Sequence, residues 1–130
     1  MTHWAGAYIG TPWVAGVSDC WSFARTIWAE HFGWIVPPAG VDVADPRAGR
    51  VALAVDPTGQ GWTPVEVPQD GDAVLMAVGA RPCHVGVWIE ADPVPGILHS
   101  VEGAGVIFTI ASRLGGIGYR VVGVYRRAAV

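Results

Sequence analysis

Three residues of this chain have the types that thiol-based catalysis needs: Cys20, His84 and His99. Cys20 directly follows Ser18 and Asp19, which are good helix-capping residues, so it is expected in the first turn of a helix. The backbone N–H groups and the dipole at that end of a helix favour the thiolate form of a cysteine. Cys20 is therefore a candidate nucleophile; the competing interpretation is an ordinary small core residue.

A cysteine nucleophile needs a base, and imidazole is the common one. The alternating segment His84 to Ile89 predicts a strand with His84 on the face opposite the aliphatic side chains. A turn around Asp92 to Gly96 would make the strand that carries His99 its hairpin neighbour, so that both imidazoles could point at one site. Because the sequence contains no Asn, His99 is the best candidate for the group that orients the base.

Three other chemistries fit these residues less well. A zinc site of Cys20, Cys83, His84 and His99 lacks the Cys-x-x-Cys or His-x-x-x-His spacing of closed sites. No nucleophile-elbow sequence surrounds any of the four serines, which are Ser18, Ser22, Ser100 and Ser112. The glycines at 115, 116 and 118 are not followed by the Lys of a phosphate loop and are interpreted as turn residues. Cys83 is interpreted as a strand-start residue that points away from the His84 face, and neither metal nor cofactor is expected.

The candidate residues lie in a chain of α+β order, with helix first and strands afterwards. Helical spacing of apolar residues and a stop at Gly33 predict a helix from about Cys20 to His31. From Trp34 to Asp70 six of the ten prolines occur, which excludes long regular elements there except a short helix through Arg47 to Ala54.

Beyond Gly71 the chain consists of short segments rich in Val and Ile, separated by turn residues at Gly79, Asp92-Pro93, Gly103 and Gly115-Gly116. The segments are Ala73 to Val78, His84 to Glu90, Ile97 to Val101, Val106 to Ile110 and Arg120 to Arg126. They predict a five-stranded, mainly antiparallel meander with the N-terminal helices packed on one face.

Composition restricts the class of protein. A length of 130 residues, 52% of them hydrophobic and 15% charged, fits a single folded domain over 1–130 and excludes disorder. No apolar run approaches the roughly 20 residues of a membrane helix, so a soluble protein without a membrane partner is expected. The net charge is −3 and no basic cluster exceeds Arg126-Arg127, which argues against nucleic-acid binding. The start lacks a secretory signal, so export by that route is not expected.

Five segments also follow a recognisable order along nearly the whole chain: Tyr8-Ile9-Gly10-Thr11-Pro12-Trp13, Asp19-Cys20-Trp21-Ser22-Phe23, Gly71-Asp72-Ala73-Val74-Leu75, Cys83-His84-Val85-Gly86-Val87 and Ile97-Leu98-His99-Ser100. In order and spacing the chain resembles the NlpC/P60 family of papain-like cysteine peptidases. It is most similar to the short single-domain versions found in phage tails and tail-like particles.

The resemblance implies a papain-like α+β fold with Cys20 as nucleophile, His84 as base and His99 as the polar third member. It implies hydrolysis of a peptide bond in the stem peptides of bacterial peptidoglycan, commonly between D-γ-glutamyl and a diamino acid. It also implies that Asp19 has the family's substrate-binding role. Trp13 and Trp21 are further substrate-binding candidates; they stand where the family commonly has Tyr and Ser, so a phenol and a hydroxyl are missing.

The setting that the resemblance implies is a phage virion or tail-like particle assembled in the bacterial cytoplasm, where the enzyme opens the wall locally. Its partners would be the peptidoglycan stem peptide and neighbouring tail proteins. Two alternatives are a catalytically silent structural tail-tip subunit of the same fold and a wall-targeting bacterial toxin. Intact Cys20, His84 and His99 favour the enzyme over the silent subunit.

Overall fold

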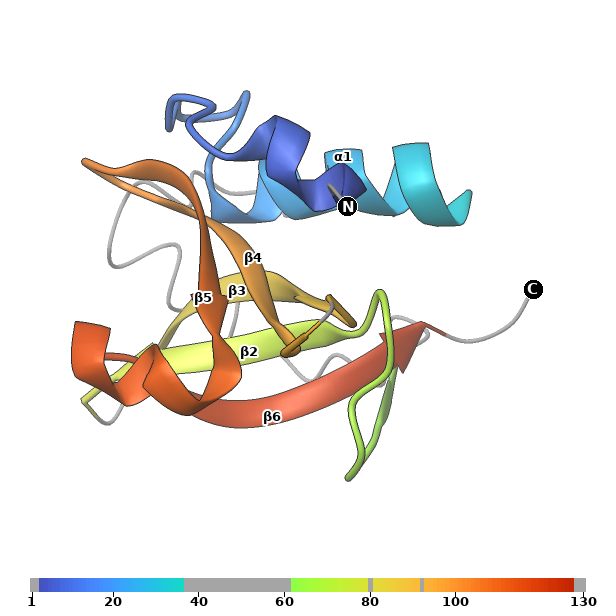
Figure 1. Ribbon diagram of the computed structural model, residues 1–130, viewed down its shortest axis with the longest axis vertical. Coiled ribbons are helices and arrows are strands. Elements are labelled where there is room, and N and C mark those ends of the chain that lie inside the picture. Colours follow the sequence, from blue (N-terminus) through green and yellow to red (C-terminus); the bar gives the residue numbers. More distant parts are fainter. Residues whose placement is uncertain (1–2, 37–61, 80, 92, 128–130) are drawn as a thin grey trace.

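The computed structural model describes residues 3–36, 62–79, 81–91 and 93–127. In these residues the chain forms an α+β fold in which one antiparallel sheet carries an α-helix on one face (Figure 1). The expected α+β class is confirmed, and the papain-like fold stays a prediction. The short helix expected through Arg47 to Ala54 lies outside the described residues.

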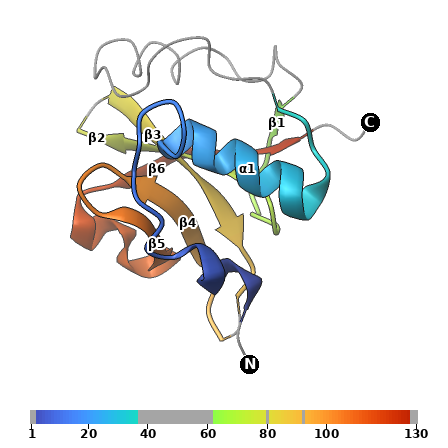
Figure 2. The same ribbon diagram turned by 90° about the horizontal axis from the view of Figure 1, so that it is seen from above.

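Helix α1 (Cys20–Phe32) begins and ends for local reasons that the sequence contains. The Asp19 carboxylate accepts a hydrogen bond from the Ser22 N–H at 2.8 Å and so caps the first turn. Gly33 ends the helix in the left-handed conformation, with φ of 69°. The predicted helix is confirmed, one residue longer at its C-terminus. Seen from above, α1 lies across the sheet and contacts strands β3 and β4 (Figure 2).

Within the described residues the sheet has six strands, so the predicted count of five was wrong. In chain order they are β1 (Trp62–Pro64), β2 (Ala73–Val78), β3 (Arg81–Ile89), β4 (Gly96–Val101), β5 (Gly105–Ile110) and β6 (Arg120–Arg127). All five predicted segments are strands, with ends shifted by no more than a few residues. The extra strand, β1, was missed because it is only three residues long and ends in a proline inside the proline-rich segment.

The strand order β1-β6-β2-β3-β4-β5 also corrects the prediction of a simple meander. Strands β2 to β5 are sequential neighbours, but β6 pairs with β2 instead of β5. The 3-10 helix η3 (Ala111–Ile117) lies between β5 and β6 and carries the chain back across the sheet. Gly115 and Gly116, expected in a turn, lie in η3, and Gly118 ends it with φ of 94°.

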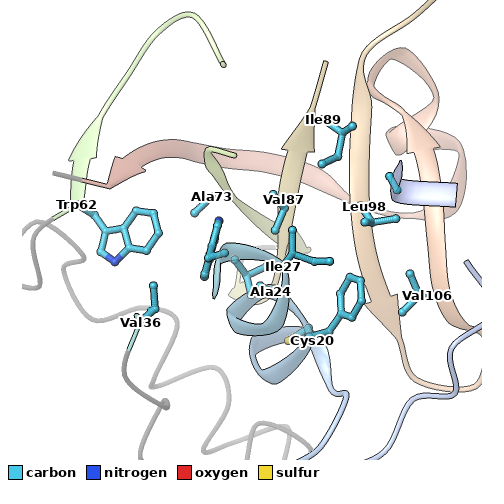
Figure 3. Close-up of a cluster of buried hydrophobic side chains, with 14 residues drawn as sticks. Cys20, Ala24, Ile27, Val36, Trp62, Ala73, Val87, Ile89, Leu98 and Val106 are labelled. Carbon is cyan, nitrogen blue, oxygen red and sulfur yellow. The ribbon is translucent and has the colours of Figure 1, made fainter. Parts of the chain in front are cut away.

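The two faces of the sheet bury different side chains. The helix face packs α1 against aliphatic residues of β3, β4 and β5, among them Val87, Leu98 and Val106 (Figure 3). The opposite face, called here the histidine face, buries a second cluster of Val74, Met76, Ile97 and Leu114, with Leu114 supplied by η3. Because both faces are covered, side chains on either one are removed from solvent.

The N-terminal segment covers the free edge of the sheet at β5. The short 3-10 helix η1 (Trp4–Tyr8) is followed by backbone hydrogen bonds from Gly10 N–H to Val106 O and from Val106 N–H to Thr11 O, both 2.9 Å. This pairing holds the segment that leads into α1 beside β5. No helix within the described residues has the length and apolar character needed to cross a membrane.

Gly86 lies at the centre of the histidine face, where a side chain has no room. A Cβ atom there would lie 2.4 Å from Ile97 Cγ2 and 3.0 Å from His99 Cβ. We therefore expect Gly86→Ala to lower the free energy of unfolding by about 1–3 kcal/mol through overpacking. Urea unfolding measures this change.

The matched control is Gly116→Ala in η3, where an added Cβ meets no atom within 4 Å. It should leave the free energy of unfolding nearly unchanged or slightly higher. Equal stability of the Gly86→Ala and Gly116→Ala variants would contradict the close packing described here.

Candidate active site

The two predicted histidines form a hydrogen-bonded pair. His84 Nε2 on β3 lies 2.7 Å from His99 Nδ1 on β4, and the two rings are inclined at 65° with centroids 4.9 Å apart. Both residues are buried, His84 with 5% and His99 with none of its surface exposed. The hairpin pairing of the two strands and the meeting of the imidazoles at one site are therefore confirmed.

Strand register explains why the rings meet. The β3–β4 ladder pairs Val87 with Leu98 and Trp88 with Ile97, and its continuation places Gly86 opposite His99, with His84 on the diagonal. A diagonal position is within reach of aromatic side chains, provided that the directly opposed residue leaves space. Gly86 leaves that space because it has no side chain.

Two residues that the sequence analysis did not single out complete the surroundings of the pair. Thr109 Oγ1 on β5 lies 2.9 Å from His99 Nε2. The Tyr119 ring stacks on His84 with centroids 4.8 Å apart and planes inclined at 19°. The period-2 pattern of β5 could have placed Thr109 on the histidine face, but Tyr119 follows η3, whose path the sequence did not indicate.

Burial holds both imidazoles in the neutral form. Desolvation lowers the pKa of His84 to about 3, with a further contribution from the positive charge of a protonated His99. Desolvation also lowers the pKa of His99 to about 4. At neutral pH each ring therefore carries one proton, with one nitrogen that donates a hydrogen bond and one that accepts. A neutral imidazole is the form that acts as a general base.

Cys20 is a reduced thiol in the first turn of α1, 6% exposed. Figure 3 shows it among buried side chains that include Ala24, Leu98 and Val106. Ser100 Oγ donates a 2.6 Å hydrogen bond to Ser18 O, which ties the approach to the helix to the residue after His99. The start of α1 is thus attached to the strand that carries the histidine pair.

Cys20 and the histidine pair approach β4 from opposite faces, since Leu98 and Ser100 point toward α1 while His99 points the other way. Beyond Val87 and Leu98 the ladder between β3 and β4 ends, although β4 still pairs with β5 as far as Val101. The hydrogen bond from Ser100 to Ser18 O brings this end of β4 next to the start of α1. Convergence of the Cys20 sulfur with an imidazole nitrogen at this point stays a prediction.

Asp19 is buried and uses both carboxylate oxygens within the protein. Oδ1 accepts from Ser22 N–H at 2.8 Å and Oδ2 accepts from Gly16 N–H at 2.6 Å. It therefore holds both the loop before α1 and the first turn of the helix. The substrate-binding role implied by the resemblance stays a prediction.

Both tryptophan candidates are half-buried near the start of α1. Trp13 lies in the loop between the segment paired with β5 and the helix, and Trp21 packs edge-on against Trp28 with ring centroids 5.7 Å apart. Their substrate-binding roles remain predictions. Ser18, by contrast, accepts from Val14 N–H and donates to Pro12 O, so it braces the loop.

The structure gives the zinc alternative no support within residues 3–36, 62–79, 81–91 and 93–127, where no three His, Cys, Asp or Glu residues are placed to hold a metal ion. The side chain of Cys83, and with it the predicted orientation, lies outside the described part of the chain. A reaction without metal remains the expectation from the thiol and the imidazole pair.

Comparison with known proteins adds no relative: no protein-family model matches the chain, and no curated protein matches its sequence.

The buried histidine pair predicts a stability that falls in acid. In the unfolded chain each imidazole has a pKa near 6.5, so below that pH the unfolded state binds protons that the native state does not. The stabilisation is complete above about pH 6.5 and decreases as the pH falls toward 4, by up to about 1.4 kcal/mol per pH unit for each histidine. Urea unfolding between pH 7.5 and pH 4.5 measures the slope.

His99→Gln should reduce the slope, because only His84 then contributes from this pair. A free energy of unfolding that stays constant from pH 6.5 to pH 4.5 in the wild-type protein would contradict the burial of two neutral imidazoles.

Asp19→Ala removes the helix cap and the acceptor for Gly16, so we expect it to lower the free energy of unfolding by about 1–2 kcal/mol. Asp19→Asn keeps one carbonyl oxygen for Ser22 and should cost less. Glu102→Ala, which removes an exposed carboxylate after β4, is the control and should have no effect. Thermal or urea unfolding of the three variants tests this order, and an Asp19→Ala protein as stable as the wild type would refute the capping role.

Proposed function

We propose that this protein is a cysteine peptidase that hydrolyses stem peptides of bacterial peptidoglycan. The observation that carries the proposal is the buried 2.7 Å contact between His84 Nε2 and His99 Nδ1, on strands tied to the start of the helix that bears the Cys20 thiol. Nucleophilic thiol catalysis needs a cysteine at a site that favours the thiolate, a base, and a group that orients the base. Cys20, His84 and His99 have the residue types and local environments for these three roles.

In the proposed reaction the thiol proton of Cys20 moves to His84 Nδ1, the ring nitrogen that does not take part in the histidine pair. The electron pair of the sulfur forms a bond to the carbonyl carbon of the scissile amide, and the carbonyl π electrons move to oxygen. The positive end of the α1 dipole favours the negative charge on sulfur and then on that oxygen.

The tetrahedral intermediate collapses when the protonated His84 gives its proton to the leaving amine and the carbon–nitrogen bond breaks. A water molecule then attacks the thioester, with His84 again taking the proton, and the carboxylic acid product leaves. The thiol is restored, and no oxidant, metal or cofactor is needed to balance the reaction.

The choice of a peptidoglycan substrate depends on the resemblance of the five segments. Two of these segments, Tyr8 to Trp13 and Asp19 to Phe23, lie just before and at the start of α1. The loop before the helix exposes the apolar side chains of Ile9, Val14 and Val17. Such an apolar border suits the methyl groups of the alanine residues in stem peptides. Delivery in a phage tail or tail-like particle, with neighbouring tail proteins as partners, belongs to the same proposal and depends on the resemblance alone.

Cleavage of defined muropeptides, followed by mass spectrometry, tests the proposal. Cys20→Ser and Cys20→Ala should lower kcat/KM by about a thousandfold or more while the protein stays folded. His84→Ala should be almost as severe, because a thiol without its base is mostly protonated at neutral pH. His99→Ala should cost less, since His99 only orients the base.

Ser112→Ala, a change at an exposed position in η3, is the matched control and should cleave at the wild-type rate. Activity should also survive EDTA, and its loss with recovery on adding zinc would favour the metal alternative. A wild-type protein that is folded but cleaves no muropeptide would favour the structural tail-tip subunit. Unchanged cleavage by Cys20→Ala would rule out the thiol mechanism.

A further inference from the structure

Thr109 extends the histidine pair by one hydrogen bond. Its register partner on β4 is Ile97, which places it diagonal to His99 on the histidine face. Its Oγ1 atom lies 2.9 Å from His99 Nε2, while His99 Nδ1 lies 2.7 Å from His84 Nε2. Thr109 is 9% exposed and His99 is fully buried. The three side chains therefore form a chain of two hydrogen bonds that ends in a hydroxyl.

The protons in this chain can be arranged in two ways. Because burial keeps both imidazoles neutral, each ring has one N–H and one nitrogen lone pair. In the first arrangement His84 Nε2–H donates to His99 Nδ1, and His99 Nε2–H donates to the Thr109 hydroxyl. In the second, the Thr109 hydroxyl donates to His99 Nε2, and His99 Nδ1–H donates to His84 Nε2.

The two arrangements differ in what they leave on the other nitrogen of His84. In the first, His84 Nδ1 has a lone pair and can accept the proton of a thiol. In the second, His84 Nδ1 already carries the proton of the neutral ring and cannot act as a base. A general base must have its lone pair on the nitrogen that faces the proton it takes.

We propose that Thr109 is a positioning residue whose hydroxyl accepts the His99 Nε2–H and so holds both histidines in the Nε2–H tautomer. The importance of this tautomer for catalysis rests on the proposed peptidase function, whereas its presence in the folded protein does not. The hydroxyl is the acceptor that lets His99 keep its proton on Nε2 in a buried site. It continues to accept after His84 has become an imidazolium, because that cation also donates through Nε2–H.

Valine tests the role of the oxygen, because it has nearly the shape of threonine but no acceptor. In Thr109→Val the Nε2–H tautomer would leave a buried N–H of His99 without an acceptor, whereas the Nδ1–H tautomer leaves a nitrogen lone pair there. Buried N–H groups without an acceptor are rarer in proteins than under-satisfied acceptors. Thr109→Val should therefore shift both rings to the Nδ1–H tautomer. Thr109→Ser keeps the oxygen and should keep the Nε2–H tautomer.

The experiment is NMR of protein labelled with ¹⁵N in histidine, which distinguishes the two tautomers by the chemical shifts of Nδ1 and Nε2. At pH 7 the wild type and Thr109→Ser should have Nε2–H on both His84 and His99, and Thr109→Val should have Nδ1–H on both. Thr26→Val, at an exposed threonine on α1, is the control and should match the wild type. Nδ1–H on both rings of the wild type, or unchanged tautomers in a folded Thr109→Val protein, would overturn the proposal.

Kinetics with muropeptides then connect the tautomer to the base. Thr109→Val should lower kcat roughly ten- to a hundredfold, because that is the shift in tautomer population expected when a buried donor loses its acceptor. KM should stay nearly unchanged, and Thr109→Ser should have the activity of the wild type. A tautomer shift without any change in kcat would overturn the catalytic part of the inference. If the wild type has the Nε2–H tautomers but cleaves no muropeptide, the peptidase proposal fails and the role of Thr109 in setting the tautomer stands.

Discussion

The buried hydrogen bond between His84 and His99 is the constraint on which the arrangement of this sheet depends. Two imidazoles without solvent must satisfy each other and their remaining nitrogens, because an unpaired buried polar group is costly. The surroundings meet this requirement: Gly86 leaves room beside Ile97 and His99 Cβ, Thr109 faces the outer nitrogen of His99, and Tyr119 stacks on His84. In the described residues, no buried side-chain nitrogen or oxygen lacks a hydrogen-bond partner.

The elements around this pair are held by further polar contacts at their ends. The carboxylate of Asp72, at the start of β2, accepts from Arg126 on β6 through Nε at 3.0 Å and Nη2 at 2.9 Å. Asp19 caps α1 and Ser100 bonds to Ser18 O, which fixes the helix start against β4. The contact between Ser100 and Ser18 joins the start of the helix that bears Cys20 to the strand that bears His99, so these two elements cannot slide past each other without breaking a buried hydrogen bond.

Burial has opposite consequences for stability and for chemistry. It lowers the pKa of both histidines, so the free energy of unfolding falls below about pH 6.5, where the unfolded chain binds protons that the native state does not. The same burial keeps the rings neutral over the pH range in which a general base must be unprotonated. In the proposed reaction the dipole of α1 stabilises the thiolate while the imidazole on β3 takes the proton, so a helix and a strand each supply one part of the chemistry.

The sequence by itself determined the elements whose signals are local. The cap at Asp19, the stop at Gly33 and the short Val- and Ile-rich segments between turn residues each depend on residues close together in the chain. The helix, strands β2 to β6 and the shared site of His84 and His99 were therefore predicted. Tertiary structure alone decided that β6 returns to β2, that β1 joins the sheet, and that Thr109 and Tyr119 surround the histidines. Those outcomes depend on register and on the path of η3, which arise from packing between residues far apart in the chain. The alternation of β5 indicates the face on which Thr109 lies, but not its contact with His99.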